Sequence, residues 1–220
     1  MTIILNLKNY PEVLGEGSVR LAKAAKAAAL SAGVEVIVAP PAAMVGLVAS
    51  SVQIPVFSQN VGTGVPGAST GATIPEALEA SGAKGSILNH SESPVPVRDL
   101  TALVPRLRGL SLSSCVCAGT TPQAVSLSGL DPDYIAIEPP ELIGSGRAVS
   151  KARPELVSQT VSKLRRAGYD GMVLCGAGIV TGEDVAKAVE LGAEGILVSS
   201  SVVRAKDWRA KIEELAYSLN

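Results

Sequence analysis

The chain has 220 residues, of which 47% are hydrophobic, and its 19 Lys and Arg nearly balance its 20 Asp and Glu, giving a net charge of −1. This size and apolar content suffice for one sizeable core, so a single domain over residues 1–220 is expected. The near-neutral charge, the absence of basic runs and an aromatic content of only 3% argue against nucleic acid as a partner.

The N-terminal segment and the cysteines favour a cytoplasmic protein. MTIILNLKNY has no basic stretch, and its apolar run is too short for a signal peptide. No run of about 18 apolar residues occurs, so no membrane partner is expected. Cys115, Cys117 and Cys175 make an odd number, which argues against disulfides, and we interpret them as small buried side chains. With a single histidine, no metal site is expected.

Short β-branched and apolar runs alternate along the chain with stretches of helical spacing. The predicted strands are Ile3–Leu7, Glu35–Ala39, Val56–Gln59, Ser86–Asn89, Ser113–Ala118, Tyr134–Ile137, Met172–Cys175 and Gly195–Val198. The predicted helices are Ser18–Ser31, Met44–Ser51, Pro75–Ser81, Val97–Leu107, Thr121–Ser128, Pro154–Ala167, Gly182–Leu191 and Asp207–Leu219. Left-handed glycines are expected after six of these helices, at Gly33, Gly82, Gly109, Gly129, Gly168 and Gly192.

This alternation predicts an α/β protein with a parallel sheet. Eight strand–helix units in one chain favour a closed (βα)8 barrel, although the chain is shorter than the typical length of about 250 residues. The alternative is an open doubly wound sheet, which would usually carry a glycine-rich turn after its first strand. The segment LNLKNY is not such a turn.

The longest segment without predicted secondary structure is Gly62–Thr73, with the sequence GTGVPGASTGAT. Compact domains rarely keep a loop of this length without a use. We therefore expect this segment to be functional or to act as an interaction arm.

Four chemically active side chains lie at the ends of three predicted strands. The first strand ends in Asn6-Leu7-Lys8, and Asn6 and Lys8, two residues apart, share a face. His90 follows the fourth strand, and Glu138 follows the sixth. Each alone has an ordinary explanation, such as a solvated lysine, a surface histidine or a strand leaving the core. In a barrel the carboxyl ends of all strands surround one mouth, so together they suit proton transfer on a carbonyl compound.

Three small-residue runs also follow strands and predict a phosphate site. They are Gly144–Gly146, Gly176–Gly178 and Ser199–Ser201. Glycine and serine let backbone N–H groups approach an anion closely, and barrels often bind phosphate beyond strands seven and eight. Each run alone is also an ordinary turn.

These motifs together resemble those of triosephosphate isomerases, most of all the compact archaeal type. The motifs in chain order are N-x-K, H-S-E, E-P-P-E-L-I-G-S-G, C-G-A-G-I and V-S-S-S. The resemblance covers essentially the whole chain. It implies a (βα)8 barrel that interconverts dihydroxyacetone phosphate and D-glyceraldehyde 3-phosphate in glycolysis and gluconeogenesis, with no metal or organic cofactor.

The resemblance also implies roles for individual residues. Glu138 would be the base, His90 a neutral electrophile, and Lys8 the cation that offsets substrate charge, with Asn6 beside it. The phosphate group would lie near Ile143, Gly144, Ser145, Gly178, Ser199 and Ser200. Between a stiff hinge at Pro139 and Pro140 and a flexible one at Gly144–Gly146, a lid would close over the substrate.

The chain departs from the common family pattern in three places. Ser93 stands where the family has an arginine after H-S-E, and Ala72 stands where it has a glutamate after Thr-Gly. In the family these two residues pair across a subunit contact. Glu141 and Leu142 replace a lid tryptophan. The catalytic residues are untouched, but the mode of assembly is put in doubt, and we expect a homo-oligomer, with a tetramer ahead of a dimer.

Two other readings stay open from the residues alone. Another phosphosugar barrel enzyme is the first, but an aldolase of the Schiff-base type needs a lysine at a mid- or late-barrel strand end. The later strands end instead in Ala118-Gly119, Glu138, Cys175-Gly176 and Ser199. The second is a barrel that binds a phosphorylated metabolite without turning it over.

Overall fold

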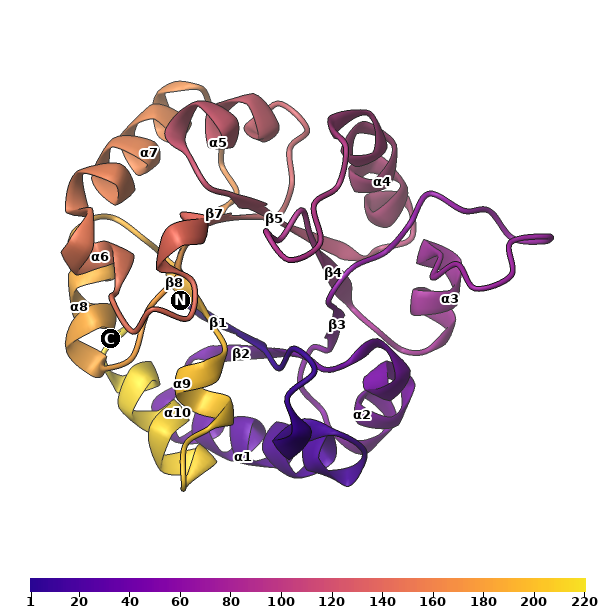
Figure 1. The fold of residues 1–220 in the computed structure, drawn as a ribbon, viewed down its shortest axis with the longest axis horizontal. Coiled ribbons are helices and arrows are strands. Elements are labelled where there is room, and N and C mark those ends of the chain that lie inside the picture. The colour runs from indigo at the N-terminus through magenta and orange to yellow at the C-terminus, as the bar shows by residue number, and fades with distance from the viewer.

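The computed structural model describes residues 1–220, and eight parallel strands form a barrel surrounded by helices (Figure 1). The strands are β1 (Thr2–Asn6), β2 (Glu35–Ala39), β3 (Phe57–Ser58), β4 (Gly85–Leu88), β5 (Ser113–Ala118), β6 (Tyr134–Ile137), β7 (Met172–Gly176) and β8 (Gly195–Val198). The predicted (βα)8 barrel is confirmed, and β2, β5, β6 and β8 have the predicted bounds.

The barrel closes between β2 and β3. The strands are hydrogen-bonded in the order β2-β1-β8-β7-β6-β5-β4-β3, and a single parallel bridge between Val38 and Val56 joins the two ends. The N–H of Val38 donates to the carbonyl oxygen of Pro55 at 3.1 Å. Pro55 has no N–H of its own, which limits pairing at this seam. The strand β3 is shorter than the predicted Val56–Gln59, because Val56 pairs only through this isolated bridge.

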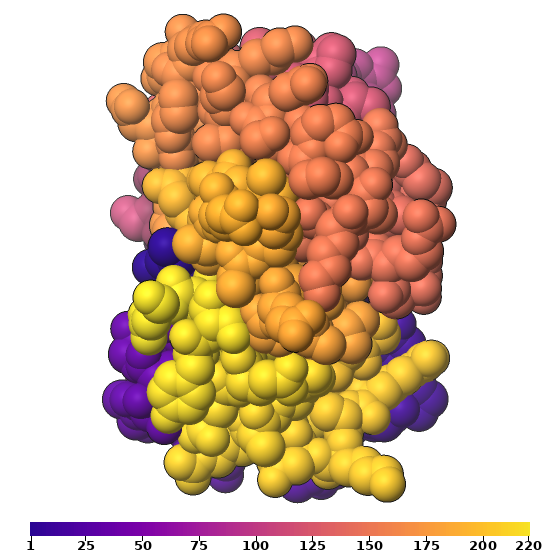
Figure 2. All heavy atoms as spheres, turned by 90° about the vertical axis from the view of Figure 1, so that its left-hand side faces the viewer, coloured from indigo at the N-terminus to yellow at the C-terminus, as the bar shows by residue number.

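Helices cover the outside of the barrel. They are α1 (Glu16–Ala32), α2 (Val45–Ser51), α3 (Pro75–Ala80), α4 (Val97–Gly109), α5 (Thr121–Ser128), α6 (Val149–Ala152), α7 (Pro154–Arg166), α8 (Gly182–Glu190), α9 (Ser200–Val203) and α10 (Trp208–Tyr217). Figure 2 shows one side, where the orange and yellow atoms of α7, α8 and α10 form a continuous face. No helix is both long and apolar enough to span a membrane.

All eight predicted helices are present, and the sequence missed α6 and α9. Each of these two helices has only four residues, too few for a periodic apolar pattern to appear. Short 3-10 turns, η1 (Pro11–Val13), η2 (Ala42–Met44) and η3 (Pro140–Leu142), were also not predicted.

Four of the six predicted glycine caps are left-handed, with φ between 67° and 95°. Gly109 and Gly129 are not: Gly109 is the last residue of α4, and Gly129 keeps a right-handed φ of −62° after α5. The positive φ falls two residues later in each case, at Ser111 (56°) and Asp131 (56°). Each of these helices therefore tightens through an extra turn before the chain reverses.

Two apolar layers hold the fold together. The space inside the barrel is filled by ten buried residues, Ile4, Ile37, Ala39, Phe57, Ile87, Cys115, Cys117, Ala136, Leu174 and Leu197. A larger cluster of 54 buried residues lies mostly between strands and helices. Phe57 fits because Gly85 beside it has no side chain, since a Cβ there would lie 2.7 Å from the Phe57 ring. All three cysteines are buried and free.

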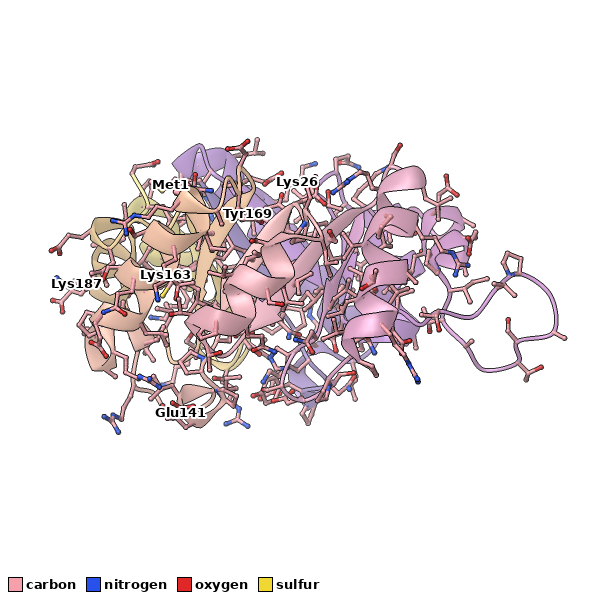
Figure 3. All side chains as sticks on the ribbon, turned by 90° about the horizontal axis from the view of Figure 1, so that it is seen from above. Met1, Lys26, Glu141, Lys163, Tyr169 and Lys187 are labelled. Carbon is pink, nitrogen blue, oxygen red and sulfur yellow. The ribbon has the colours of Figure 1, made fainter.

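The loops at the two ends of the barrel differ in length. In Figure 3, Glu141 lies at the end opposite Met1, so the long loops that follow the strands gather on the side of Glu141. The segment 62–73 extends away from the barrel between β3 and α3 (Figures 1 and 3). This extended segment, called the arm below, is mostly exposed.

Candidate active site

Glu138 is the first residue after β6, and its side chain is buried under the barrel mouth. Its N–H donates to the carbonyl oxygen of Ala118 at 2.9 Å, which continues the sheet pairing, and the residue is only 7% exposed. Gly176 at the end of β7 makes room for the carboxylate, because a Cβ there would overlap the Glu138 side chain. The Oε2 atom of Glu138 is buried without a hydrogen-bond partner.

Burial raises the pKa of Glu138 to about 7. Hydrogen bonding with the Cys117 thiol, the positive charge of Lys8 and the backbone N–H of Ala177 act in the opposite direction and lower this pKa. Burial dominates because a carboxylate in an apolar setting loses its hydration. A carboxyl group with a pKa near neutrality can both take and return a proton in one reaction cycle.

His90 is 5% exposed and faces Glu138 across the mouth. Its Nδ1 accepts a hydrogen bond from the backbone N–H of Glu92 at 3.1 Å, so this nitrogen carries no proton. Burial, and then Lys8, lowers the pKa of His90, whereas Glu92 raises it. The imidazole is therefore neutral with its proton on Nε2, which lies 3.6 Å from Oε2 of Glu138.

Lys8 is held in an unusual backbone conformation, with φ of 48°. Its N–H donates to Oδ1 of Asn6 at 3.0 Å, and its carbonyl oxygen accepts from the Gln59 side chain at 2.9 Å. A lysine in this region costs roughly 1–3 kcal/mol, so the surrounding contacts have to maintain it. Its Nζ lies 2.5 Å from Oε1 of Glu92, which fixes a cation at the edge of the mouth.

The segment after Glu138 covers the mouth. Ile143, Gly144 and Gly146 line a cavity of about 60 Å³ together with Lys8, His90 and Glu138. Gly144 and Gly146 both have positive φ, 70° and 71°. Beyond them, the N–H of Val149 donates to the carbonyl oxygen of Ala177 at 3.1 Å, so the end of this segment is tied to the loop after β7.

Free hydrogen-bond donors line the cavity, both in this covering segment and in the loops after β7 and β8. No hydrogen bond of the structure uses the backbone N–H of Gly144, Gly178 or Ser199. The hydroxyl oxygens of Ser199 and Ser201 are buried and also unpartnered. Hydroxyl groups buried without partners are costly, and together with the free backbone N–H groups beside them they suit an anionic ligand.

The structure brings nearly all predicted site residues to this one cavity. Those that line it are Asn6, Lys8, His90, Glu138, Ile143, Gly144, Gly178, Ser199 and Ser200. Ser145 does not, because its hydroxyl and its N–H both donate to the carbonyl oxygen of Leu142, at 2.7 Å and 3.2 Å. The N–H of Ile143 likewise donates to Pro140 within the lid at 3.2 Å.

Sequence reasoning missed Tyr10, which lines the cavity. The guanidinium of Arg204 lies 4.8 Å from the centre of its ring. Tyr10 continues the alternation of Asn6 and Lys8, and this spacing was the one available signal. No group of three or more His, Cys, Asp and Glu side chains is arranged to hold a metal ion.

Comparison with known proteins decides the family. A family model described as triosephosphate isomerase matches residues 1–215. The chain belongs to the triosephosphate isomerase family. Its relatives include the triosephosphate isomerases of Cenarchaeum symbiosum, 47% identical over 219 residues (99% of this chain and 97% of the relative), and Caldivirga maquilingensis, 45% identical over 217 residues (99% and 96%). That of Methanothermus fervidus is 44% identical over 213 residues (97% and 96%).

The membership confirms the predicted family and the predicted enzyme class, an isomerase. The chain spans nearly the full length of these relatives, so they are equally compact. The catalytic and binding roles of the individual residues stay predictions, and their geometry is the basis for the proposal below.

The neutral state of His90 can be tested directly, because it is the only histidine of the chain. In ¹⁵N NMR spectra of the folded protein, we expect a proton on Nε2 and none on Nδ1 from pH 8 down to pH 6. The same protein in denaturant serves as the control and should titrate near the ordinary value of about 6.5. A folded-state titration at that value would contradict the assignment.

Proposed function

We propose that this triosephosphate isomerase interconverts dihydroxyacetone phosphate and D-glyceraldehyde 3-phosphate through an enediolate, in glycolysis and gluconeogenesis. The observation that carries the proposal is the Glu138 carboxylate. One of its oxygens is buried and unpartnered, and it lies 3.6 Å from the neutral imidazole of His90. A base and a hydrogen-bond donor this close can act on adjacent atoms of one small substrate.

Glu138 removes a proton from the carbon next to the substrate carbonyl. The electron pair of that C–H bond forms the C=C bond of the enediolate, and the carbonyl oxygen takes on the negative charge. The Nε2–H of His90 donates a hydrogen bond to this oxygen, and Lys8 offsets the charge from the edge of the mouth. The former carbonyl oxygen takes the Nε2 proton of His90, and Nε2 is reprotonated by the hydroxyl group on the first carbon. As that C–O⁻ group becomes the new C=O, the C=C electron pair takes the proton of protonated Glu138 onto the neighbouring carbon, which completes the isomerisation.

The phosphate group binds the free donors that line the cavity. The unused N–H groups of Gly144, Gly178 and Ser199 support this placement, with Ser200 beside them at the start of α9. Ile143 and Ser145 contribute through the shape of the lid, because their own N–H groups are already bonded within it. Phosphate binding far from the reacting carbons holds the lid over the site and keeps water from the enediolate.

The chain acts as a single domain in the cytoplasm and assembles as a homo-oligomer, with a tetramer ahead of a dimer. The arm supports assembly because it extends from the barrel and carries no charged side chain. A cavity of about 550 Å³ beside Lys8 and His90, lined also by Gln59 and Glu92, offers a second copy a place for it.

Replacing Glu138 with Gln tests the base. The substitution keeps the size of the side chain but removes the proton acceptor, so kcat should fall by roughly 10²–10⁴-fold. Turnover of glyceraldehyde 3-phosphate is followed by NADH loss through glycerol-phosphate dehydrogenase, and binding of inorganic phosphate is measured in parallel.

Retained phosphate binding with lost turnover supports the assignment. Equal turnover in both proteins would refute Glu138 as the base. A folded wild type without turnover would favour a barrel that binds a phosphorylated metabolite, or an enzyme for another phosphosugar.

Assembly through the arm is tested by replacing residues 63–72 with two glycines. The shortened protein should sediment as a smaller species than the wild type while keeping its fold by circular dichroism. An unchanged sedimentation coefficient, after correction for the lost mass, would show that the arm is not needed for assembly.

A further inference from the structure

Arg106 connects the arm to the body of the barrel. It lies on α4, and its Nη1 donates to the carbonyl oxygens of Thr63 at 3.3 Å and Gly64 at 2.8 Å. Its Nε and Nη2 donate to the two carboxylate oxygens of Glu76 in α3, at 2.9 Å and 2.5 Å. One planar guanidinium therefore links two helices and the root of the arm.

The other hydrogen bonds of the arm are internal. The N–H of Gly62 donates to the carbonyl oxygen of Thr73 at 2.9 Å, which closes its root, and the N–H of Ala72 donates to Ser69 at 3.0 Å near its tip. The hydroxyl of Ser69 donates to the carbonyl oxygen of Val65 at 2.9 Å. The two bonds from Arg106 are the only hydrogen bonds that join residues 62–73 to the rest of the chain.

The arm could otherwise pivot at its root. It contains Gly62, Gly64, Gly67 and Gly71 and has no charged side chain that could pair with the body. Glycine-rich segments have many accessible backbone conformations, so fixing their direction requires contacts from outside. Arg106 and Glu76 are only 24% and 32% exposed in their side chains, so their ion pair is partly shielded from solvent.

We propose that Arg106 is a positioning residue that sets the direction of the arm before a second copy binds. The ion pair between Arg106 and Glu76, called the clamp below, fixes the position of the guanidinium. The guanidinium in turn holds the root of the arm through two backbone carbonyl oxygens. The arm is thus ordered before a second copy binds, so its backbone loses little conformational entropy during assembly. This inference rests on the proposed function, in which the arm contacts a second copy of this chain.

Arg106→Met in the full-length protein is the decisive variant, because methionine keeps much of the aliphatic volume but donates no hydrogen bond. Amide hydrogen exchange should become faster in residues 62–73 and stay unchanged in the strands. The dissociation constant of the oligomer should rise roughly ten- to hundredfold, as expected for the loss of hydrogen bonds from a charged group. At protein concentrations high enough to restore assembly, kcat should match the wild type.

Arg108→Met is the matched control. Arg108 lies on the same helix and pairs with Asp131 at 2.9 Å, but it does not contact the arm. It should change neither the exchange of the arm nor the dissociation constant. Arg106→Lys should fall between wild type and Arg106→Met, because an ammonium group keeps the charge but cannot make all four bonds at once.

The outcomes separate this inference from the proposal of assembly. If the amides of residues 62–73 exchanged at the same rate in Arg106→Met as in the wild type, the positioning role would be overturned, whatever the oligomeric state. Faster arm exchange with an unchanged dissociation constant would overturn the link between the clamp and assembly. Should the wild type prove monomeric, the proposal of assembly and its link to the clamp would both fail, while the exchange data would still test the clamp.

Discussion

A carboxylate buried with one unpartnered oxygen is the constraint on which the rest of the site depends. Glu138 loses its hydration under the lid, and the structure supplies little to replace it on Oε2. Gly176 leaves the space that the side chain needs, and His90 presents a neutral imidazole instead of a compensating cation. Glu138 is therefore a stronger base than an ordinary carboxylate, because no hydrogen-bond donor stabilises the negative charge on Oε2 in the free enzyme.

Two other unfavourable conformations, the backbone of Lys8 and the direction of the arm, are stabilised by contacts within the same chain. Asn6 and Gln59 support the left-handed backbone of Lys8, as Arg106 and Glu76 support the arm. Two of the three departures from the family pattern, Ser93 and Ala72, also lie within contacts of this one chain. Ser93 accepts a hydrogen bond from Asn60 of its own chain at 3.0 Å, and Ala72 lies in an arm whose root Arg106 already holds.

The sequence predicted what depends on short-range pattern, and it missed what depends on distant residues meeting. The alternation of apolar runs located all strands, and the strand ends identified Glu138, His90 and Lys8 as neighbours at one mouth. The bonded state of Ser145 depends on how the lid folds back on itself, which no local pattern reveals. The clamp of Arg106 joins residues 30 or more positions apart, so periodicity and capping rules gave no sign of it.

The pH dependence of kcat/KM tests the buried base most directly, because this ratio reports ionisations of the free enzyme. Since burial raises the pKa of Glu138 to about 7 and the base acts when deprotonated, kcat/KM should rise with pH through about 7 and then level off. The substrate phosphate also titrates, near about 6, and its inflection is the same for every variant. Glu138→Asp is therefore the control, because only an inflection that belongs to the enzyme can shift in it. An inflection near 4.5, the ordinary value for a glutamate, would contradict the account.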